Sequence, residues 1–194
     1  MQVLNLINKN NYTLTYKLGK ELGYGAHGQI FDLIDFPNKA IKLSVCFDQF
    51  DGKLSSVYEE INKNLSYIKT NKSQILVCVY EHNFILNGCR KTINKNQNYI
   101  LYYYIMEKLQ EISNDEAEVF RYILDETIVK DVCSADVLRN LQLTLDINKK
   151  NVMMFFDGLK NSKIKHLDLH VRNIMKDRRG NFKLIDLDLI EIGD

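Results

Sequence analysis

The sequence predicts an α+β fold in two lobes: an antiparallel sheet with one helix, followed by a smaller, mainly helical lobe. Through the first hundred residues, apolar runs alternate with turns, a pattern typical of strands. Beyond about residue 113, apolar residues recur with helical periodicity. Residues 1–109 are therefore predicted to form the first lobe, and residues 110–194 the second.

Five strands and one helix are expected in the first lobe. The strands are the run leading into the glycines near residue 23, then residues 30–34, 39–43, 75–80 and 99–106. The turn at Phe36-Pro37-Asn38 makes the second and third strands antiparallel neighbours. Apolar residues of the segment 54–68 recur at spacings of three and four, which places them on one face of a helix against the sheet.

Composition and charge narrow the possible functions. The 194 residues are 45% hydrophobic and 26% charged, as in ordinary globular proteins. Because 26 Lys and Arg nearly balance 25 Asp and Glu, no overall field attracts nucleic acid or an anionic membrane. The sequence shows no signal-peptide pattern and no run of 18 apolar residues. We expect a cytosolic protein that recognises its partners locally, without nucleic acid or a membrane.

A glycine-rich segment is the first motif with chemical content. Gly23, Gly25 and Gly28 match G-x-G-x-x-G, and the aliphatic Ile30 follows. Glycines in such a pattern let backbone N–H groups approach phosphate oxygens. A plain glycine-containing hairpin is the alternative. A strand follows the motif, whereas a dinucleotide-binding turn requires a helix, so its position favours a flap over a nucleotide.

A lysine and an acidic pair also fit a nucleotide site. Lys42 follows Ala40 within an otherwise apolar strand, and Glu59 and Glu60 lie on the predicted helix. The spacing suits a partly exposed lysine that contacts phosphates and forms an ion pair with one of these glutamates. Glu60 lies nearer the apolar face of the helix and is slightly favoured, while Glu59 stays open. A solvated edge lysine is the alternative reading.

The last predicted strand of the first lobe continues into a segment suited to a hinge. Met106 is expected at the back of a nucleotide pocket. Backbone groups from Glu107 to Leu109 are expected at the edge of an adenine ring. Without the other motifs, an edge strand with a polar end would give the same pattern.

The most specific signal lies between residues 165 and 188. His166, Asp168 and Asn173 form H-x-D-x-x-x-x-N, and a short hairpin and an apolar strand ending in Asp186 follow. In this order the motifs resemble the protein-kinase-like superfamily, whose members transfer the γ-phosphoryl group of ATP. The resemblance extends over about residues 17–190 and implies a bilobal kinase-like fold that binds Mg-ATP between its lobes.

The resemblance also implies a role for each motif residue. Asp168 would orient the acceptor hydroxyl and take its proton, while Asn173 and Asp186 would bind Mg²⁺ or Mn²⁺ at the phosphates. Lys42 completes the catalytic set with Asp168 and Asn173, and His166 is expected to be a structural, hydrogen-bonded histidine of the loop. The implied ATP-binding residues are Gly23, Gly25, Gly28, Ile30, Ala40, Lys42, Glu60, Met106, Glu107 and Leu109.

Three features depart from ordinary protein kinases. Leu167 replaces the arginine before the catalytic aspartate, so switching by loop phosphorylation is not expected. His170 stands where Ser/Thr kinases have lysine, and Asp186-Leu187-Asp188 replaces D-F-G. The Asp-Leu-His segment and the second acidic residue are similar to aminoglycoside and choline phosphotransferases.

The sequence is compatible with three functions. Few residues follow Asp186, so the activation segment and later helices of a full kinase are not expected. We expect a minimal Ser/Thr-type protein kinase, similar to truncated viral kinases or to those that bacterial pathogens inject into host cells. It would act on a docked folded protein, or be activated by one, in a host cytosol. The alternatives are a small-molecule phosphotransferase and a pseudokinase that binds a partner.

Overall fold

The computed structural model describes residues 2–7, 13–25, 28–47, 54–91, 96–130 and 147–193. The chain divides into two compact units. The first unit consists of Met1–Lys72 and Cys78–Lys108, and the second of Ser73–Val77 and Leu109–Asp194. Ala26 and His27, at the tip of the predicted glycine-rich hairpin, lie outside the described residues.

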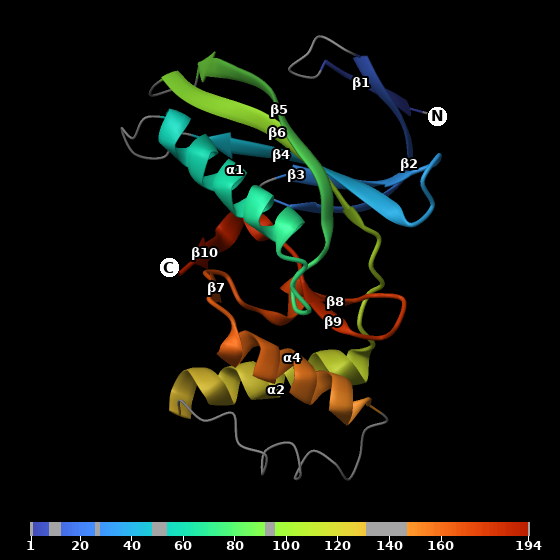
Figure 1. Cartoon of the computed structure of the whole chain (residues 1–194), viewed down its shortest axis with the longest axis vertical. Helices are drawn as coiled ribbons and strands as arrows, with labels where there is room; N and C mark the ends of the chain where they lie inside the picture. Colours follow the sequence, from blue (N-terminus) through green and yellow to red (C-terminus); the bar gives the residue numbers. More distant parts are fainter. Residues whose placement is uncertain are drawn as a thin grey trace. The chain divides into compact units, whose positions relative to one another are not determined.

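Six strands form one antiparallel sheet in the first unit, in the order β1-β2-β3-β4-β6-β5 (Figure 1). Their bounds are β1 Gln2–Ile7, β2 Thr13–Gly25, β3 Gly28–Leu33, β4 Lys39–Phe47, β5 Val79–Lys91 and β6 Asn96–Glu107. The prediction of five strands was wrong because β1 was missed. Pairing with β2, which brings Leu4 opposite Tyr16, holds this strand and buries Leu6. A short local pattern does not reveal such pairing.

The predicted strand at residues 75–80 was displaced. Residues 73–77 belong to the second unit, and β5 begins only at Val79. Leu76 forms a parallel bridge with Leu184, and the Val77 N–H donates to the Leu184 carbonyl at 2.9 Å. The apolar run is buried as expected, but it contributes to the core of the second unit.

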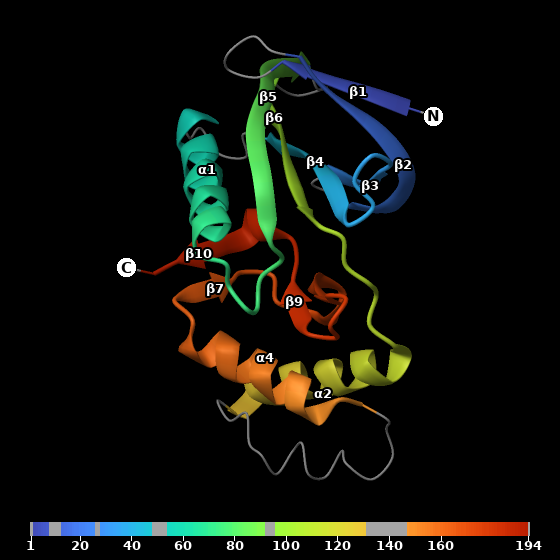
Figure 2. The same ribbon diagram turned by 45° about the vertical axis from the view of Figure 1, so that its right-hand side comes forward.

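The sheet curls so that strands far apart in its order share a core (Figure 2). The rings of Tyr16 on β2 and Tyr103 on β6 are 6.3 Å apart, although β3 and β4 separate their strands. Tyr103 Oη donates to Glu81 Oε1 at 2.6 Å, and Tyr16 Oη also donates to this carboxylate. Burial and the adjacent Glu81 charge raise the pKa of Tyr16 to about 12, so its phenol remains a donor. The core cluster contains Leu6, Tyr16, Leu18, Phe31, Leu33, Ile41, Tyr103 and Ile105.

Helix α1, Leu54–Thr70, packs against β5 and β6, on the face of the sheet that carries Tyr102 and Tyr104. The predicted helix at residues 54–68 is therefore confirmed. The helix buries Ile61, Leu65 and Ile68 at spacings of three and four. The side chains of Tyr58 and Ser66 contact Phe84 and His82 of β5.

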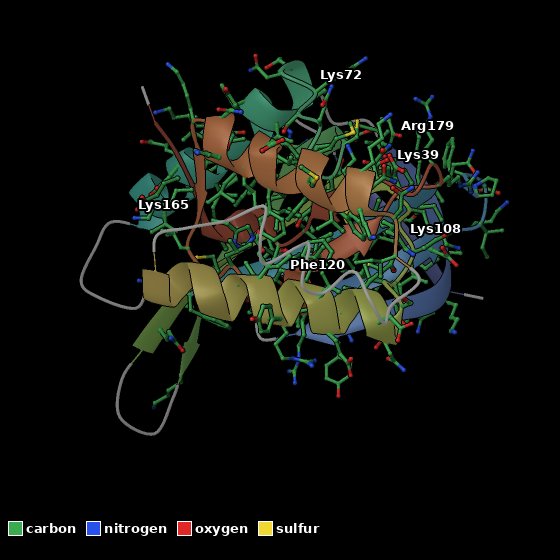
Figure 3. All side chains as sticks on the ribbon, turned by 90° about the horizontal axis from the view of Figure 1, so that it is seen from below. Lys39, Lys72, Lys108, Phe120, Lys165 and Arg179 are labelled. Carbon is green, nitrogen blue, oxygen red and sulfur yellow. The ribbon has the colours of Figure 1, made fainter. Side chains whose placement is uncertain are left out.

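The second unit combines two described α-helices with short strands. Their bounds are α2 Asn114–Lys130, α4 Lys149–Asn161, β7 Ile164–His166, β8 Ile174–Lys176, β9 Phe182–Leu184 and β10 Ile190–Ile192. Strand β7 pairs with β10 and β8 with β9, both antiparallel. Phe120 of α2 packs against Phe155 of α4 and Phe182 of β9, with ring centroids 5.4 and 4.7 Å away (Figure 3). None of the helices described is long and apolar enough to cross a membrane.

A capping box ties α2 to β8. Ser113 Oγ accepts from the Glu116 N–H at 3.2 Å, and Glu116 Oε2 accepts from the Ser113 N–H at 2.8 Å. Lys176 of β8 pairs with the same Oε2 at 2.7 Å. Burial on its own would raise the pKa of Glu116, but these hydrogen bonds and the Lys176 charge lower it. Helix α2 is thus anchored at the strand that begins immediately after Asn173.

Candidate active site

The H-x-D-x-x-x-x-N motif lies in the second unit, in residues 166–173, which we call the catalytic loop. His166 ends β7, and Asp168 follows in the turn. Asn173 closes the 3-10 turn Val171–Asn173, immediately before β8. Asp186 comes two residues after β9 and precedes the 3-10 turn Leu187–Leu189. The three predicted acidic and amide residues are therefore carried by short elements of one unit.

His166 connects the catalytic loop to the segment that carries Asp186. Its ring is buried, and Nδ1 accepts from the Asp168 N–H at 3.3 Å. In the neutral imidazole the proton is then on Nε2, which donates to the Ile185 carbonyl at 2.9 Å. The prediction that His166 is a structural histidine of the loop is confirmed.

Asn173 is held by its backbone and its side chain. The Asn173 N–H donates to the His170 carbonyl, and the Asn173 carbonyl accepts from the Ile185 N–H, both at 2.9 Å. Its Nδ2 donates to the Asp168 carbonyl, also at 2.9 Å. Because Nδ2 is used in this way, Oδ1 is the amide atom left to bind a cation.

Asp186 has a left-handed backbone conformation, which few non-glycine residues adopt. It follows Ile185, whose N–H and carbonyl are bonded to Asn173 and His166 respectively. Its φ and ψ are 61° and 58°, and it is the one non-glycine residue with positive φ in the described ranges. Such a conformation costs roughly 1–3 kcal/mol and recurs at functional sites. The hydrogen bonds of Ile185 to Asn173 and His166 form a frame in the second unit. This hydrogen-bond frame holds the strained Asp186 immediately after Ile185.

Asn173 and Asp186 have the donor chemistry for Mg²⁺ bound with a nucleotide. Amide and carboxylate oxygens are hard ligands, and Mg²⁺ is commonly held by one or two carboxylates together with waters and substrate phosphates. Among the residues that the structure describes, no group of three or more His, Cys, Asp or Glu side chains forms a metal cage. The two residues therefore fit an ion that phosphates help to coordinate.

Seven of the predicted nucleotide residues share one face of the sheet in the first unit. Paired residues in antiparallel strands lie on the same face, as do residues two positions apart. Ile30 pairs with Lys42, and Ala40 pairs with Met106. This face is opposite the one that buries Ile41 in the core cluster. The structure gathers on it Gly23, Gly25, Gly28, Ile30, Ala40, Lys42 and Met106.

Lys42 is more buried than predicted. The residue is 6% exposed, and its Nζ lies 5.5 Å from the centroid of the Tyr104 ring. The expectation of a partly exposed lysine was wrong because side chains on the same face of the interior strands, among them the cross-strand neighbour Tyr104, surround it. Glu59 and Glu60 are both exposed on α1, so burial does not choose between them. Their pairing with Lys42 stays a prediction.

The three glycines of the motif have different surroundings. Gly28 has φ of 153°, and a Cβ built there would lie 2.1 Å from the Leu43 carbonyl oxygen of β4. The fold itself therefore requires glycine at this position. A Cβ at Gly23 or Gly25 would meet nothing within 4 Å. Packing within the described part of the chain does not explain these two glycines, so their predicted role at a ligand stays a prediction.

Alanine substitutions should separate the structural role of Gly28 from the predicted ligand-binding role of Gly25. Gly28→Ala is expected to destabilise the chain by about 1–3 kcal/mol, because the new methyl group overlaps β4 and the backbone is strained. Gly25→Ala should change stability by less than about 0.5 kcal/mol but weaken Mg-ATP binding. Denaturant unfolding and nucleotide titration measure the two effects. Full ATP affinity in Gly25→Ala would remove this glycine from the nucleotide site.

The predicted hinge uses part of its backbone within the first unit. The Glu107 N–H donates to the Cys78 carbonyl at 3.0 Å, and the Lys108 N–H to the Asn38 carbonyl at 2.9 Å. Glu107 Oε1 also accepts from the Cys78 N–H at 2.8 Å. Two of the three predicted hinge N–H groups are thus used within the first unit, and the adenine contact of Leu109 stays a prediction. Met106 is buried, and its place at the back of a nucleotide pocket stays a prediction.

Comparison with solved structures identifies the fold. The ROP18 kinase domain in complex with AMP-PNP and sucrose aligns with a TM-score of 0.55 and 12% identity, over 98% of this chain and 56% of that chain. Monomeric WbdD aligns with a TM-score of 0.46 and 14% identity, over 97% and 40%. The chain thus spans about half the length of these structures. No protein-family model and no curated protein matches the sequence. The likeness to ROP18 shows that the chain has a kinase-like fold.

Proposed function

We propose that the chain binds Mg-ATP and transfers its γ-phosphoryl group to an acceptor hydroxyl. The hydrogen-bond frame of the second unit carries this proposal, because His166 and Ile185 tie Asp168, Asn173 and the strained Asp186 together. The kinase-like fold supports it, since the ROP18 kinase domain was solved with the ATP analogue AMP-PNP.

Each proposed site residue would have one role in phosphoryl transfer. The reaction passes through a loose transition state, so positioning and charge neutralisation matter more than a strong nucleophile. Bound Mg²⁺ would neutralise negative charge on the phosphates. Asn173 Oδ1 and the Asp186 carboxylate would hold that ion, and Lys42 would bind phosphate oxygens. Asp168, whose side chain is 51% exposed, would orient the acceptor hydroxyl and accept its proton.

We also propose that the acceptor belongs to a folded protein. Leu167 is 51% exposed immediately beside Asp168, where a docked protein substrate would meet it. No arginine stands at this position to bind a loop phosphate, so activity would be constitutive or depend on a bound partner. A small-molecule phosphotransferase remains the second candidate, favoured by the Asp168-Leu169-His170 segment.

Labelled ATP tests this function together with the role of Lys42. The purified chain should transfer label from γ-labelled Mg-ATP to the protein fraction of a cell lysate in preference to the metabolite fraction. Lys42→Met should lower the rate by about 10²–10³-fold, because it removes a charge aimed at the phosphates. The variant should remain folded, since methionine replaces the buried stem with an apolar chain of similar length.

The exposed Lys63 of α1 provides the matched control. Lys63→Met should keep the wild-type rate. Full activity in Lys42→Met would contradict the assignment, and label in the metabolite fraction alone would favour the small-molecule enzyme. Binding of Mg-ATP without any transfer would indicate a pseudokinase.

A further inference from the structure

We propose that His170 is a positioning residue that holds the Asp168 carboxylate through its Nε2–H. The inference rests on the proposed phosphoryl transfer, in which Asp168 faces the acceptor. From the sequence, His170 stands where Ser/Thr kinases have lysine, and no role was predicted for it. In the structure its Nε2 lies 3.3 Å from Asp168 Oδ2.

The contacts of His170 determine which ring nitrogen carries the proton. Nδ1 accepts from the Arg172 N–H at 3.1 Å and thereby caps the 3-10 turn Val171–Asn173. Nε2 faces two groups at 3.3 Å, the acceptor Asp168 Oδ2 and the donor Asn173 Nδ2. A proton on Nε2 satisfies the contacts to Arg172 and Asp168, whereas a proton on Nδ1 satisfies only the contact to Asn173. The Nε2–H form is therefore favoured.

The Asn173 amide does not replace Asp168 as the acceptor for the Nε2–H of His170. Its Nδ2 also donates to the Asp168 carbonyl at 2.9 Å, so flipping the amide would place an oxygen against that carbonyl. Nδ2 thus stays on the side of His170, and Asp168 Oδ2 remains the acceptor for the ring N–H.

The backbone of Asp168 does not need His170 to stay in place. Its N–H is bonded to His166 Nδ1 and its carbonyl to Asn173 Nδ2. The carboxylate is half exposed, and on a surface such a group samples several rotamers. A hydrogen bond from His170 Nε2–H to Oδ2, across the 3.3 Å that separates these atoms, would restrict this motion and leave Oδ1 for the acceptor hydroxyl. An exposed pair of this kind adds little stability, so its effect should appear in the rate of transfer.

Two substitutions separate the functions of the ring. His170→Gln keeps a donor near the Nε2 position, and His170→Asn keeps an acceptor near the Nδ1 position that caps the turn. Hydrolysis of γ-labelled Mg-ATP, with water as the acceptor, serves as the probe reaction for kcat and for the KM of ATP. We expect His170→Asn to lose about 10–100-fold in kcat at unchanged KM and melting temperature. His170→Gln should recover most of the rate. Equal kcat values in the two variants would overturn the proposal.

A spectroscopic measurement tests the contact without relying on activity. The side-chain nitrogen resonances of the four histidines in the wild-type chain, assigned by the loss of one set in His170→Gln, report the tautomer of each ring. We expect His170 to be the Nε2–H tautomer and its Nε2 resonance to move in Asp168→Ala. An Nδ1–H tautomer would overturn the proposal. If the wild-type chain transfers γ-label neither to water nor to any acceptor in a cell lysate while these resonances behave as expected, the proposed function fails and the contact stands.

Discussion

Asp168→Ala is expected to slow phosphoryl transfer by about 10²–10⁴-fold while leaving Mg-ATP affinity unchanged. In the proposed transfer, the substitution would remove the group that orients the acceptor and takes its proton. The catalytic loop should keep its geometry, because its bonds to Asp168 use the backbone N–H and carbonyl. Turnover with γ-labelled ATP and calorimetric titration with Mg-ATP measure the two quantities on the same protein.

Glu191 supplies the control for removing a carboxylate from the second unit. Its side chain is 54% exposed and pairs with Lys165 at 3.5 Å, a surface contact worth at most about 1 kcal/mol. Glu191→Ala should keep both turnover and affinity. Near-normal turnover in Asp168→Ala would show that Asp168 is not the base.

Asp186→Asn is expected to weaken Mg-ATP binding and to lower turnover by about 10²–10³-fold. Asparagine keeps the size of the side chain and tolerates the left-handed backbone at this position, so the change removes charge with little added strain. If Asp186 holds the proposed Mg²⁺, both quantities should fall, because the ion at the phosphates would lose its carboxylate ligand. Alanine adopts this backbone conformation less readily, so Asp186→Ala would combine loss of the charge with added strain.

Titration without a divalent ion separates metal binding from misfolding. Wild-type chain and Asp186→Asn should bind metal-free ATP with the same weak affinity and differ only when Mg²⁺ is added. Equal affinities of the two proteins for Mg-ATP would show that Asp186 is not a metal ligand.

The sequence patterns correctly predicted helix α1 and the short loop that carries the H-x-D-x-x-x-x-N motif, because neighbouring residues along the chain determine both. Helix α1 follows from its apolar spacing, and the catalytic loop is compact in sequence, so its residue types were informative. Strand β1 was missed and β5 misplaced because their positions depend on partners elsewhere in the chain: β1 pairs with β2, and the run containing Leu76 bridges to Leu184.

The surroundings of the site residues also depend on distant contacts. Lys42 is buried against its cross-strand neighbour Tyr104. The apolar run of β6 does not indicate which of its residues faces Lys42, so this burial could not be predicted. The bond from His166 to the Ile185 carbonyl joins residues 19 apart in sequence and was not foreseen. One missed feature had a visible signal, since Ser113 and Glu116 form the S-x-x-E pattern of a capping box.

The position of the transferred group tests the central proposal most directly. The wild-type chain and Mg²⁺ are incubated with a cell lysate and ATP labelled either at the γ-phosphate or at the α-phosphate. Phosphoryl transfer predicts label on the acceptor only from γ-labelled ATP, with ADP released in equal amount. Label on the acceptor from α-labelled ATP would show nucleotidyl transfer, and no label from either form would show that the chain is not a phosphotransferase under these conditions; both results contradict the proposed function.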